Sequence, residues 1–430
     1  MYIAEKIRQL RIHKGMNQSE FVNGICSITY LSRIENGKIP PSKSFLSKIS
    51  KKLDIDVEYL TTNDVTNFKS TILEIIKRYK SNNSLSEKEL ALLEIHATEA
   101  HPPDTLIEVY GVLLHYYVNK QELEKANKIY TNSLELLPNH IHSLYPDKSI
   151  YYYISCGSYL YYKQDFNGAS KFYLKANQLL IDDESSLRAN LYYNISLVQQ
   201  RMNKKQDVSR SYAFKAHDIY IKLNQKQNII AVLITIGVQY HLDALYEESK
   251  LYLEKAEQLV DQNAEEVIIG MIKYNYGRVY QGLGDYKKAI RSFEDSLQIH
   301  EGNDRERIYS LRGLIEVYTE LKEWNQVNLH LLEAIEILQK CDMASVYIDI
   351  HSLAANLYKV RKDDFNYEKE MKNIIATSLD NKLYVKASKY SRQIGDHYHE
   401  VNAYKMAAKY YRMSLENQDK ILEQEENHSK

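Results

Sequence analysis

A short basic stretch near the amino terminus carries side chains suited to binding a polyanion. Residues 1–52 hold ten Lys and Arg against three Asp and Glu, a net charge of +7, whereas the other residues together carry −8. Thr29, Ser32 and Arg33 place two hydroxyls and a guanidinium group close together within this stretch. Such groups donate to phosphates and to base edges in the major groove of DNA. The charge balance predicts polyanion binding at this end of the chain and no general attraction for polyanions elsewhere.

A second set of candidate residues is spaced along the rest of the chain. Asn194, Asn275 and Asn356 are separated by 81 residues in each step. An asparagine side chain carries both donors and an acceptor, which match the two hydrogen-bonding groups of an extended peptide unit. A row of asparagines on one surface can therefore hold a peptide backbone without reading its side chains.

The basic stretch is predicted to fold as five short helices. Gly15 ends the first helix, and Asn17 with Glu20 forms a capping box that begins the second. Ser27 can cap a third helix, and Gly37 suits the left-handed position that ends it. A short helix, a tight turn and a third helix have helix-turn-helix geometry, with the outward face of the third helix free to enter a major groove. The residues expected to face the core of this head are Ile3, Ile7, Leu10, Phe21, Val22, Ile25, Leu31, Ile34, Phe45, Leu46, Ile49 and Leu53.

Residues 17–42, NQSEFVNGICSITYLSRIENGKIPPS, resemble the phage-repressor type of helix-turn-helix, and the match covers roughly residues 3–60. The resemblance implies that Glu35 pairs with Arg11 inside the domain. One residue departs from the pattern, because Ile28 could touch a thymine methyl group but cannot pair with guanine. The alternative is that Ile28 and Tyr30 only pack, and that the domain binds protein. The DNA contacts that the resemblance implies are Gln18, Ser27, Ile28, Thr29, Tyr30, Arg33, Lys38 and Lys43.

After a polar connector at residues 61–67, the chain repeats itself with a period near 40 residues. Each strong copy has a small residue on one helix, usually with an aromatic three residues on, and Ala or a large apolar residue at fixed offsets on the next helix. The four strong copies are Gly157 with Ala169, Tyr173 and Ala176; Gly237 and Tyr240 with Leu253 and Ala256; Gly277 and Tyr280 with Ala289 and Phe293; and Gly395 and Tyr398 with Ala407 and Tyr411. Small residues let two helices approach closely, and the large side chain fills the gap beyond them. These offsets, with the turn at residues 284–289 (GDYKKA), resemble the tetratricopeptide repeat. They predict about nine helix pairs stacked in a right-handed superhelix with a concave inner surface.

The composition agrees with an all-α fold. The chain has 430 residues, only 14 glycines, and 6 prolines that all lie in its first third. A sheet-rich protein would need many more turns that contain Gly or Pro. We expect residues 1–63 to form the DNA-binding domain, residues 64–103 a linker and first helix pair, and residues 104–424 the repeat domain.

The location expected from the sequence is the cytoplasm. No signal peptide is recognisable, because the chain is charged from residue 5 onward, and the longest uncharged run, between Lys226 and Asp243, is too short to cross a bilayer. Cys26, Cys156 and Cys341 are few and far apart, which suits a reducing compartment. We therefore expect no disulfide framework, no metal site, no cofactor and no membrane partner.

The first helix of each pair is expected to line the concave surface. Arginines on this lining could take a peptide carboxylate, and tyrosines could form apolar walls with polar tips. The plainer alternative is that the asparagines bond to neighbouring helices and that most of the 38 tyrosines fill the core. The predicted peptide-binding residues are Tyr193, Asn194, Tyr274, Asn275, Arg278, Arg312, Asn356 and Arg392, with Tyr151 and Tyr309 as further wall residues.

The combination of this head with this repeat array resembles the peptide-pheromone-responsive regulators of the Rap/NprR/PlcR/PrgX type from Gram-positive bacteria. The resemblance implies a quorum-sensing transcriptional regulator controlled by a short re-imported signalling peptide. It also implies a homodimer or higher oligomer on an inverted-repeat operator. The alternative is a peptide-controlled inhibitor that binds a response regulator of the sporulation phosphorelay.

An enzyme is not expected. The sequence contains no glycine-rich phosphate loop, GxSxG elbow or HExxH motif. The Rap branch of the family includes response-regulator phosphatases, which use a glutamine in the helical bundle before the repeats. Residues 61–120 contain no glutamine, which argues against a phosphatase of that type.

Overall fold

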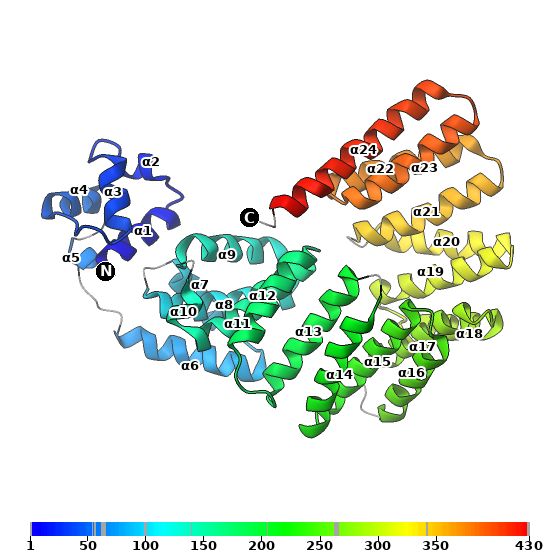
Figure 1. Ribbon diagram of the computed structural model, residues 1–430, viewed down its shortest axis with the longest axis horizontal. Coiled ribbons are helices and arrows are strands. Elements are labelled where there is room, and N and C mark those ends of the chain that lie inside the picture. The colour runs from blue at the N-terminus through cyan, green and yellow to red at the C-terminus, as the bar shows by residue number, and fades with distance from the viewer. Residues whose placement is uncertain are drawn as a thin grey trace. The chain divides into compact units, whose positions relative to one another are not determined.

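The computed structural model describes residues 2–53, 55, 57–61, 66–98, 101–138, 140–203, 205–261, 266–340 and 343–427. Throughout these ranges the regular elements are helices, which confirms the all-α prediction (Figure 1). Contacts within the chain divide it into two compact units, Met1–Asn203 and Lys204–Lys430.

The amino-terminal unit begins with the predicted head of five short helices. The apolar residues expected inside this head form one buried cluster, in which Ile7, Leu31, Ile34 and Ile49 are fully shielded from solvent. Ile3, Leu10 and Ile25 pack against the cluster while partly exposed. The five helices are α1 (Tyr2–His13), α2 (Gln18–Val22), α3 (Ile28–Glu35), α4 (Lys43–Leu53) and α5 (Val57–Thr61).

Local signals fix the boundaries of the head helices as the sequence predicts. The backbone nitrogen of Glu20 donates to Asn17 Oδ1 at 2.9 Å, and the backbone nitrogen of Asn17 donates to Glu20 Oε2 at 2.8 Å, which completes the capping box. Ser27 Oγ accepts from the backbone nitrogen of Tyr30 at the start of α3. Gly37 follows α3 with φ of +67°, a conformation that costs glycine little.

The rest of the amino-terminal unit consists of helices that pack in sequence. Pro103 and Pro146 occupy the first turns of two of them, where a missing backbone donor costs nothing. These helices are α6 (Thr66–Asn82), α7 (Glu87–Thr98), α8 (Pro103–Asn119), α9 (Leu123–Leu136), α10 (Ile141–Leu144), α11 (Pro146–Tyr162), α12 (Phe166–Leu179) and α13 (Ser186–Met202).

The carboxy-terminal unit continues the same pattern of consecutive antiparallel helices. Its helices are α14 (Asp207–Lys222), α15 (Lys226–Leu242), α16 (Tyr246–Leu259), α17 (Glu266–Gly282), α18 (Tyr286–Ile299), α19 (Asp304–Glu320), α20 (Trp324–Leu338), α21 (Ala344–Val360), α22 (Asp364–Asp380), α23 (Tyr384–Glu400) and α24 (Tyr404–Asn427).

The two helices of each strong pair approach closely at a glycine, as the small residues predict, and there the glycine meets a large residue of the second helix. A Cβ placed on Gly277 would lie 2.5 Å from the ring of Phe293, and one on Gly157 would lie 2.5 Å from the ring of Tyr173. Gly313 of α19 approaches the ring of Phe293 equally closely, so this buried ring packs against two glycines. The repeat register assigned from the sequence is therefore confirmed at these positions.

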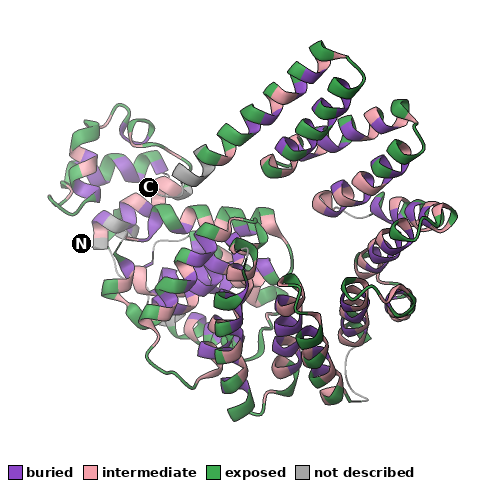
Figure 2. Cartoon of the chain, turned by 45° about the vertical axis from the view of Figure 1, so that its right-hand side comes forward, coloured by how far each residue is buried: buried purple, intermediate pink, exposed green. Residues whose placement is uncertain are grey.

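The first helices of successive pairs form a layer of their own within each unit. Besides the contacts inside each pair, α8 contacts α11, and in the carboxy-terminal unit α15 contacts α17, α17 contacts α19 and α19 contacts α21. Figure 2 shows the buried residues on the sides of the helices that face their neighbours. The inner surface predicted from the sequence would be the side of this layer that faces away from the second helices.

The turn inside most helix pairs contains a residue in the left-handed conformation. Only one of these turns in the described ranges has a glycine there, Gly284 with φ of +76°. The others hold Gln121, Gln164, Ala244, Lys322, Lys362 and Asn402, with φ between 58° and 62°.

Among the described residues, no helix combines the length and the apolar character that crossing a bilayer requires.

Candidate DNA-reading and peptide-binding sites

The amino-terminal end of α3 presents the predicted DNA-reading residues to solvent. Ser27, Thr29 and Arg33 are exposed, and Ile28 has 48% of its surface accessible. The opposite side of α3 is fixed by the buried residues Leu31 and Ile34. The helix thus turns an apolar face into the head and leaves a mixed polar, basic and apolar face outside.

A buried carboxylate organises the residues behind this face. Glu35 accepts from Arg11 Nε at 2.6 Å and from Arg11 Nη2 at 3.1 Å, which confirms the predicted structural pair. Gln18 Nε2 donates to the same carboxylate at 2.7 Å. The side chain of Gln18 is therefore oriented by the head itself, and its amide oxygen is the group left to face a ligand.

Tyr30 has a structural role at the end of this face. Its hydroxyl accepts from the backbone nitrogen of Ser42 at 3.2 Å, and its ring packs edge-on against Phe45 with centroids 5.7 Å apart. These contacts tie α3 to the start of α4. The alternative that Tyr30 packs within the head is therefore observed. Its contact with DNA stays a prediction.

Lys38 and Lys43 lie exposed on either side of the turn that follows α3. Their ammonium groups add to the exposed positive charge that Arg33 provides on α3. Cations at this distance from a reading helix suit the phosphates that flank the bases.

In the amino-terminal unit, Asn194 lines a cavity of 230 Å³ with residues from α8, α11, α12 and α13. His115 is the central polar group there, because its Nδ1 lies 2.9 Å from Tyr79 Oη and 3.2 Å from Asn119 Nδ2. Burial lowers the pKa of His115 to about 4, so the imidazole is neutral near pH 7 and can accept at Nδ1. The lining residues are His115, Val118, Asn119, Ser158, Tyr161, Tyr162, Tyr173, Asn194 and Leu197. Tyr193, next to Asn194 on α13, is half-buried.

In the carboxy-terminal unit, predicted arginines belong to a chain of ion pairs across α17, α19, α21 and α23, here called the ion-pair ladder. Arg278 bonds to Glu316, which also accepts from Arg312 Nε at 2.8 Å. Arg312 Nη1 reaches Asp349 Oδ2 at 3.0 Å, and Lys386 Nζ reaches Asp349 Oδ1 at 2.7 Å. The ladder is defined by Arg278, Glu316, Arg312, Asp349 and Lys386.

The ladder has three cations and two anions, and its members stabilise one another's charges. Although burial works against the charge of Arg312, the carboxylates of Glu316 and Asp349 raise its pKa. Likewise, burial opposes ionisation of Glu316, but Arg278 and Arg312 lower its pKa. A ligand carboxylate that binds here must therefore compete with Glu316 or Asp349 for guanidinium donors.

Tyr274 and Asn275 lie one turn before Arg278 on α17. The ring of Tyr274 packs against Phe293 at 5.8 Å and against Tyr309 at 6.3 Å between centroids, so it forms a wall beside the ladder. Asn275 Nδ2 donates to the carbonyl of Met271 on its own helix at 2.8 Å. This bond differs from the neighbouring-helix bond that the plainer alternative assumed, and it leaves the Asn275 carbonyl oxygen for a ligand.

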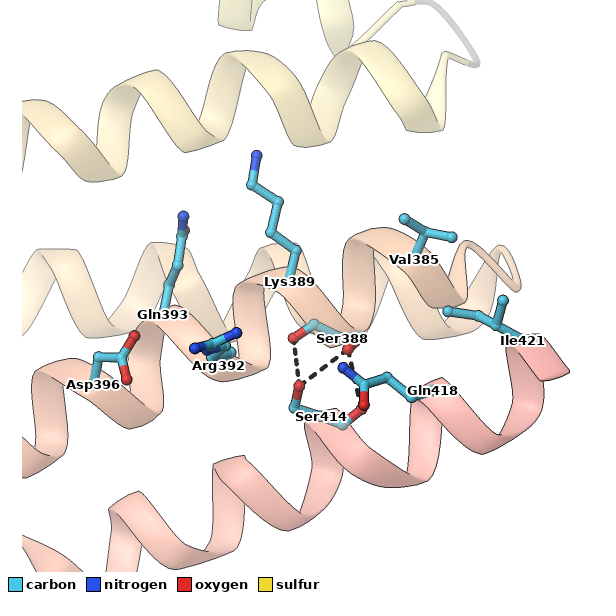
Figure 3. A pocket seen from close by; sticks show the side chains of 9 residues that line it. All are labelled: Val385, Ser388, Lys389, Arg392, Gln393, Asp396, Ser414, Gln418 and Ile421. Atoms are coloured by element: carbon cyan, nitrogen blue, oxygen red, sulfur yellow. Dashed lines mark hydrogen bonds between the residues drawn. The ribbon is translucent and has the colours of Figure 1, made fainter. Parts of the chain in front are cut away.

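Arg392 is exposed and lines an open pocket of 530 Å³ on α23 and α24. Figure 3 shows Lys389 and Gln393 extending from α23 away from α24, while Ser414 and Gln418 approach from α24. Ser388 Oγ and Ser414 Oγ lie 3.0 Å apart and tie the two helices together beneath the pocket. Asn356 is exposed on α21 and is not among the residues that line this pocket.

The structure thus brings Tyr274, Arg278 and Arg312 together, and places Asn194 and Arg392 in separate pockets. The sequence analysis missed Glu316, Asp349 and Lys386, although Glu316 lies 38 residues after Arg278, close to one repeat length. It also missed His115 and Asn119. Within the described ranges, no cluster of His, Cys, Asp and Glu has the arrangement of a metal site. Cys341 lies outside the described residues.

Comparison with known proteins places these features in context. Residues 7–60 match the family model described as "Helix-turn-helix". The chain is 23% identical over 407 residues to the transcriptional activator NprA of Geobacillus stearothermophilus, covering 92% of this chain and 98% of NprA. It is also 23% identical over 321 residues to response regulator aspartate phosphatase I of Bacillus subtilis (strain 168), covering 74% of this chain and 80% of that protein.

A solved structure of NprR in complex with its cognate peptide NprX has a similar fold. The TM-score is 0.56 at 16% identity, with 83% of this chain and all of the NprR chain covered. The resemblance drawn from the sequence is therefore confirmed: over most of its length the chain is similar to the NprR and Rap regulators, and its residues 7–60 form a helix-turn-helix.

Proposed function

We propose that this protein is a transcriptional regulator that binds operator DNA through residues 1–63 and is controlled by a short signalling peptide bound by residues 104–424. Residues 64–103 would connect the two parts. The observation that carries the proposal is the exposed amino-terminal end of α3, where Ile28, Thr29 and Arg33 project from a head with a helix-turn-helix fold. Similarity to the transcriptional activator NprA supports it.

The free side of the layer of first helices is the surface proposed for the peptide. Similarity to peptide-bound NprR supports this assignment. On this surface the ion-pair ladder offers guanidinium groups that can exchange an internal carboxylate for one on the peptide, and Tyr274 offers an apolar wall. The residues proposed to contact peptide remain Tyr193, Asn194, Tyr274, Asn275, Arg278, Arg312, Asn356 and Arg392.

The proposed regulator acts in the cytoplasm of a Gram-positive bacterium as a homodimer. Two recognition helices related by a two-fold axis read half-sites about one DNA turn apart, so the operator would be an inverted repeat. Peptide would change DNA binding through its different affinity for two arrangements of the repeats. This role requires no catalytic residue.

Replacement of Arg33 by Ala tests the DNA-binding half of the proposal. We expect operator affinity to fall by a factor on the order of 5 to 150, which corresponds to about 1–3 kcal/mol, because one groove-reading cation is lost. The measurement is a titration of the full-length protein against a DNA site selected in vitro by the wild type. Lys51→Ala, which removes an exposed cation at the end of α4, is the matched control. Equal affinity of the Arg33 variant and the wild type would refute the role of Arg33.

Replacement of Asn275 by Ala tests the peptide half. A peptide selected from a random library by the wild-type protein serves as the probe. We expect its Kd to rise by a factor on the order of 2 to 10, the worth of one hydrogen bond, while DNA affinity without peptide stays unchanged. A normal peptide dose-response in this variant would remove Asn275 from the site.

Binding of a response regulator is the second candidate function, favoured by the similarity to response regulator aspartate phosphatase I. The missing glutamine in residues 61–120 argues for binding without phosphatase activity. A pull-down of purified response regulators, repeated with the selected peptide, tests it. Capture that the peptide reverses would support a protein-binding role, and no capture in either condition would oppose it.

A further inference from the structure

The first helix of the head contacts more than the head itself. Ala4 and Ile7 point into the apolar core of the head. Gln9 lies on another side of α1, yet only 1% of its surface is exposed. A glutamine is seldom buried so completely unless its amide is bonded. The burial of Gln9 therefore identifies a second, polar contact surface on α1.

This polar surface rests on the first helices of the repeat array, which belong to the same compact unit as the head. Gln9 Nε2 donates to the backbone carbonyl of His101 at 3.0 Å. Arg8 Nη2 donates to the backbone carbonyl of Glu135 at 2.7 Å, and α1 contacts α9 directly. Glu135 lies in the last turn of α9, where carbonyls lack partners within the helix and a cation is favoured by the helix dipole.

His101, whose carbonyl accepts the hydrogen bond from Gln9, is itself buried and in contact with α7. His101 is 5% exposed, and its Nε2 lies 3.0 Å from His96 Nδ1 of α7. Tyr110 of α8 donates from its hydroxyl to the carbonyl of Ala97 at 3.1 Å. The carbonyl that receives Gln9 thus belongs to a buried residue whose side chain contacts α7 and which directly precedes Pro102 and α8.

The contact leaves the reading face open. Ile28, Thr29 and Arg33 remain exposed on α3 while α1 is engaged. On the repeat side, α8 carries both His115 and Asn119 of the cavity that contains Asn194. One end of α8 therefore lies close to His101, which the head contacts, and the other end lines a proposed ligand pocket.

From these contacts we infer that α1 is a docking helix. Gln9 binds the head to His101, just before α8, and Arg8 binds it to the end of α9. We infer further that this dock transmits the state of the repeats to the head. The dock sets the orientation of each head relative to the first repeats. Its role in control rests on the proposed function, whereas its existence as an interface does not.

The first experiment tests the dock without DNA. Hydrogen exchange is measured on the full-length wild type, on the double variant Arg8→Ala/Gln9→Ala and on the control Lys51→Ala. We expect the amides of α1 and of His101 to exchange at least tenfold faster in the double variant, while α3 and α4 keep their protection. Unchanged exchange at both places would overturn the dock. Gln9→Glu, which puts a carboxylate against the His101 carbonyl, is the second variant and should give the same change if the double variant folds poorly.

The second experiment tests transmission with the in-vitro-selected DNA. Single half-site affinity should stay within twofold of the wild type in the double variant, because the reading residues are intact. Two operators are then compared, one with the selected half-site spacing and one whose half-sites lie half a helical turn further apart. We expect the ratio of the two affinities to be at least fivefold smaller in the double variant than in the wild type. Retained discrimination together with faster exchange would show a dock that does not control DNA binding. Failure of the wild type to bind any DNA would refute the proposed function and leave the exchange result standing.

Discussion

At the residue scale, the candidate sites are built from groups whose charge states are set by their surroundings. The neutral His115 can accept a hydrogen bond at Nδ1 beside the amino-terminal cavity, whereas Arg312 and Glu316 hold each other charged in the ladder. The two units would thus offer different chemistry to the proposed peptide. The amino-terminal cavity suits an uncharged polar or aromatic side chain, and the ladder suits a charged one.

The state of His115 makes stability depend on pH. Its pKa is about 4 in the folded chain and about 6.5 when unfolded, so the unfolded state binds more protons between these values. Stability is therefore complete above the unfolded pKa and declines as the pH falls toward 4, with a loss of about 2 kcal/mol at pH 5. The measurement is urea denaturation of the full chain at pH 7 and at pH 5.

His115→Gln is the variant for this pH prediction, since glutamine retains a polar group and cannot be protonated. We expect the variant to lose about 2 kcal/mol less than the wild type between the two pH values. Burial and the nearby Arg278 also lower the pKa of His241 to about 4, so the wild-type decline continues in the variant in weaker form. Identical declines in the two proteins would show that His115 does not titrate as described.

At the element scale, the helix pairs are held by close approach at glycine. Phe293 is fully buried and packs against both Gly277 of α17 and Gly313 of α19, so its ring has no room to retreat. Gly237 is less tightly packed, because a Cβ there would lie 3.2 Å from the side chain of Leu253 and 3.3 Å from the carbonyl oxygen of Ser249, contacts that shifts of a few tenths of an ångström relieve. The same position of the repeat therefore tolerates an added methyl group better in one repeat than in another.

Replacement of Gly277 by Ala should destabilise the carboxy-terminal unit by about 1–3 kcal/mol, the usual cost of overpacking a core. Alanine favours a helix over glycine by about 1 kcal/mol, but this gain does not offset a contact of 2.5 Å with a ring that cannot move. Gly237→Ala is the matched control and should be close to neutral. Thermal unfolding of both variants checks the difference, and equal melting temperatures would contradict the packing argument.

The elements also show which features the sequence could predict. The capping box of Asn17 and Glu20 and the spacing from Gly277 to Phe293 are local or periodic, and both were predicted correctly. The left-handed turns were harder to see, because Lys322 adopts the same conformation as Gly284 without any sequence signal. Neighbouring helices impose that conformation, and a lysine tolerates it at some cost.

The candidate sites were predicted less completely than the helices. Arg278 and Arg312 were identified as lining residues, but their internal acceptors Glu316 and Asp349 were not. Which carboxylate meets which guanidinium group depends on the stacking of whole repeats, and a single sequence gives no measure of that stacking. The docking of α1 was missed for a similar reason, since Arg8 and its acceptor Glu135 are 127 residues apart.

At the scale of the whole molecule, a basic head is joined to an acidic repeat array. The net charge is +7 in residues 1–52 and −8 in the remainder, so the proposed attraction to DNA would be confined to the head. The proposed two-fold dimer would place two such heads on one operator. The repeats would then determine spacing without competing for phosphates.

The dimer proposal predicts two chains for each inverted-repeat operator and one for each isolated half-site. Sedimentation of the full-length protein with each DNA gives these ratios directly. Binding should also weaken with salt, with a slope near −0.9 for each phosphate contact in the plot of log affinity against log salt. A single chain on the full operator at saturating protein would rule out the two-fold arrangement.

The dock of α1 has a consequence for how such regulators diverge. Arg8 and Gln9 both grip main-chain oxygens, at Glu135 and His101, and every amino acid supplies a carbonyl. Substitutions beneath the head can therefore accumulate without removing an acceptor, provided that the backbone path is kept. Two related proteins with very different repeat sequences should therefore still accept each other's heads. A chimaera of the two would keep the dock if the transplanted first helix carried the arginine and the glutamine.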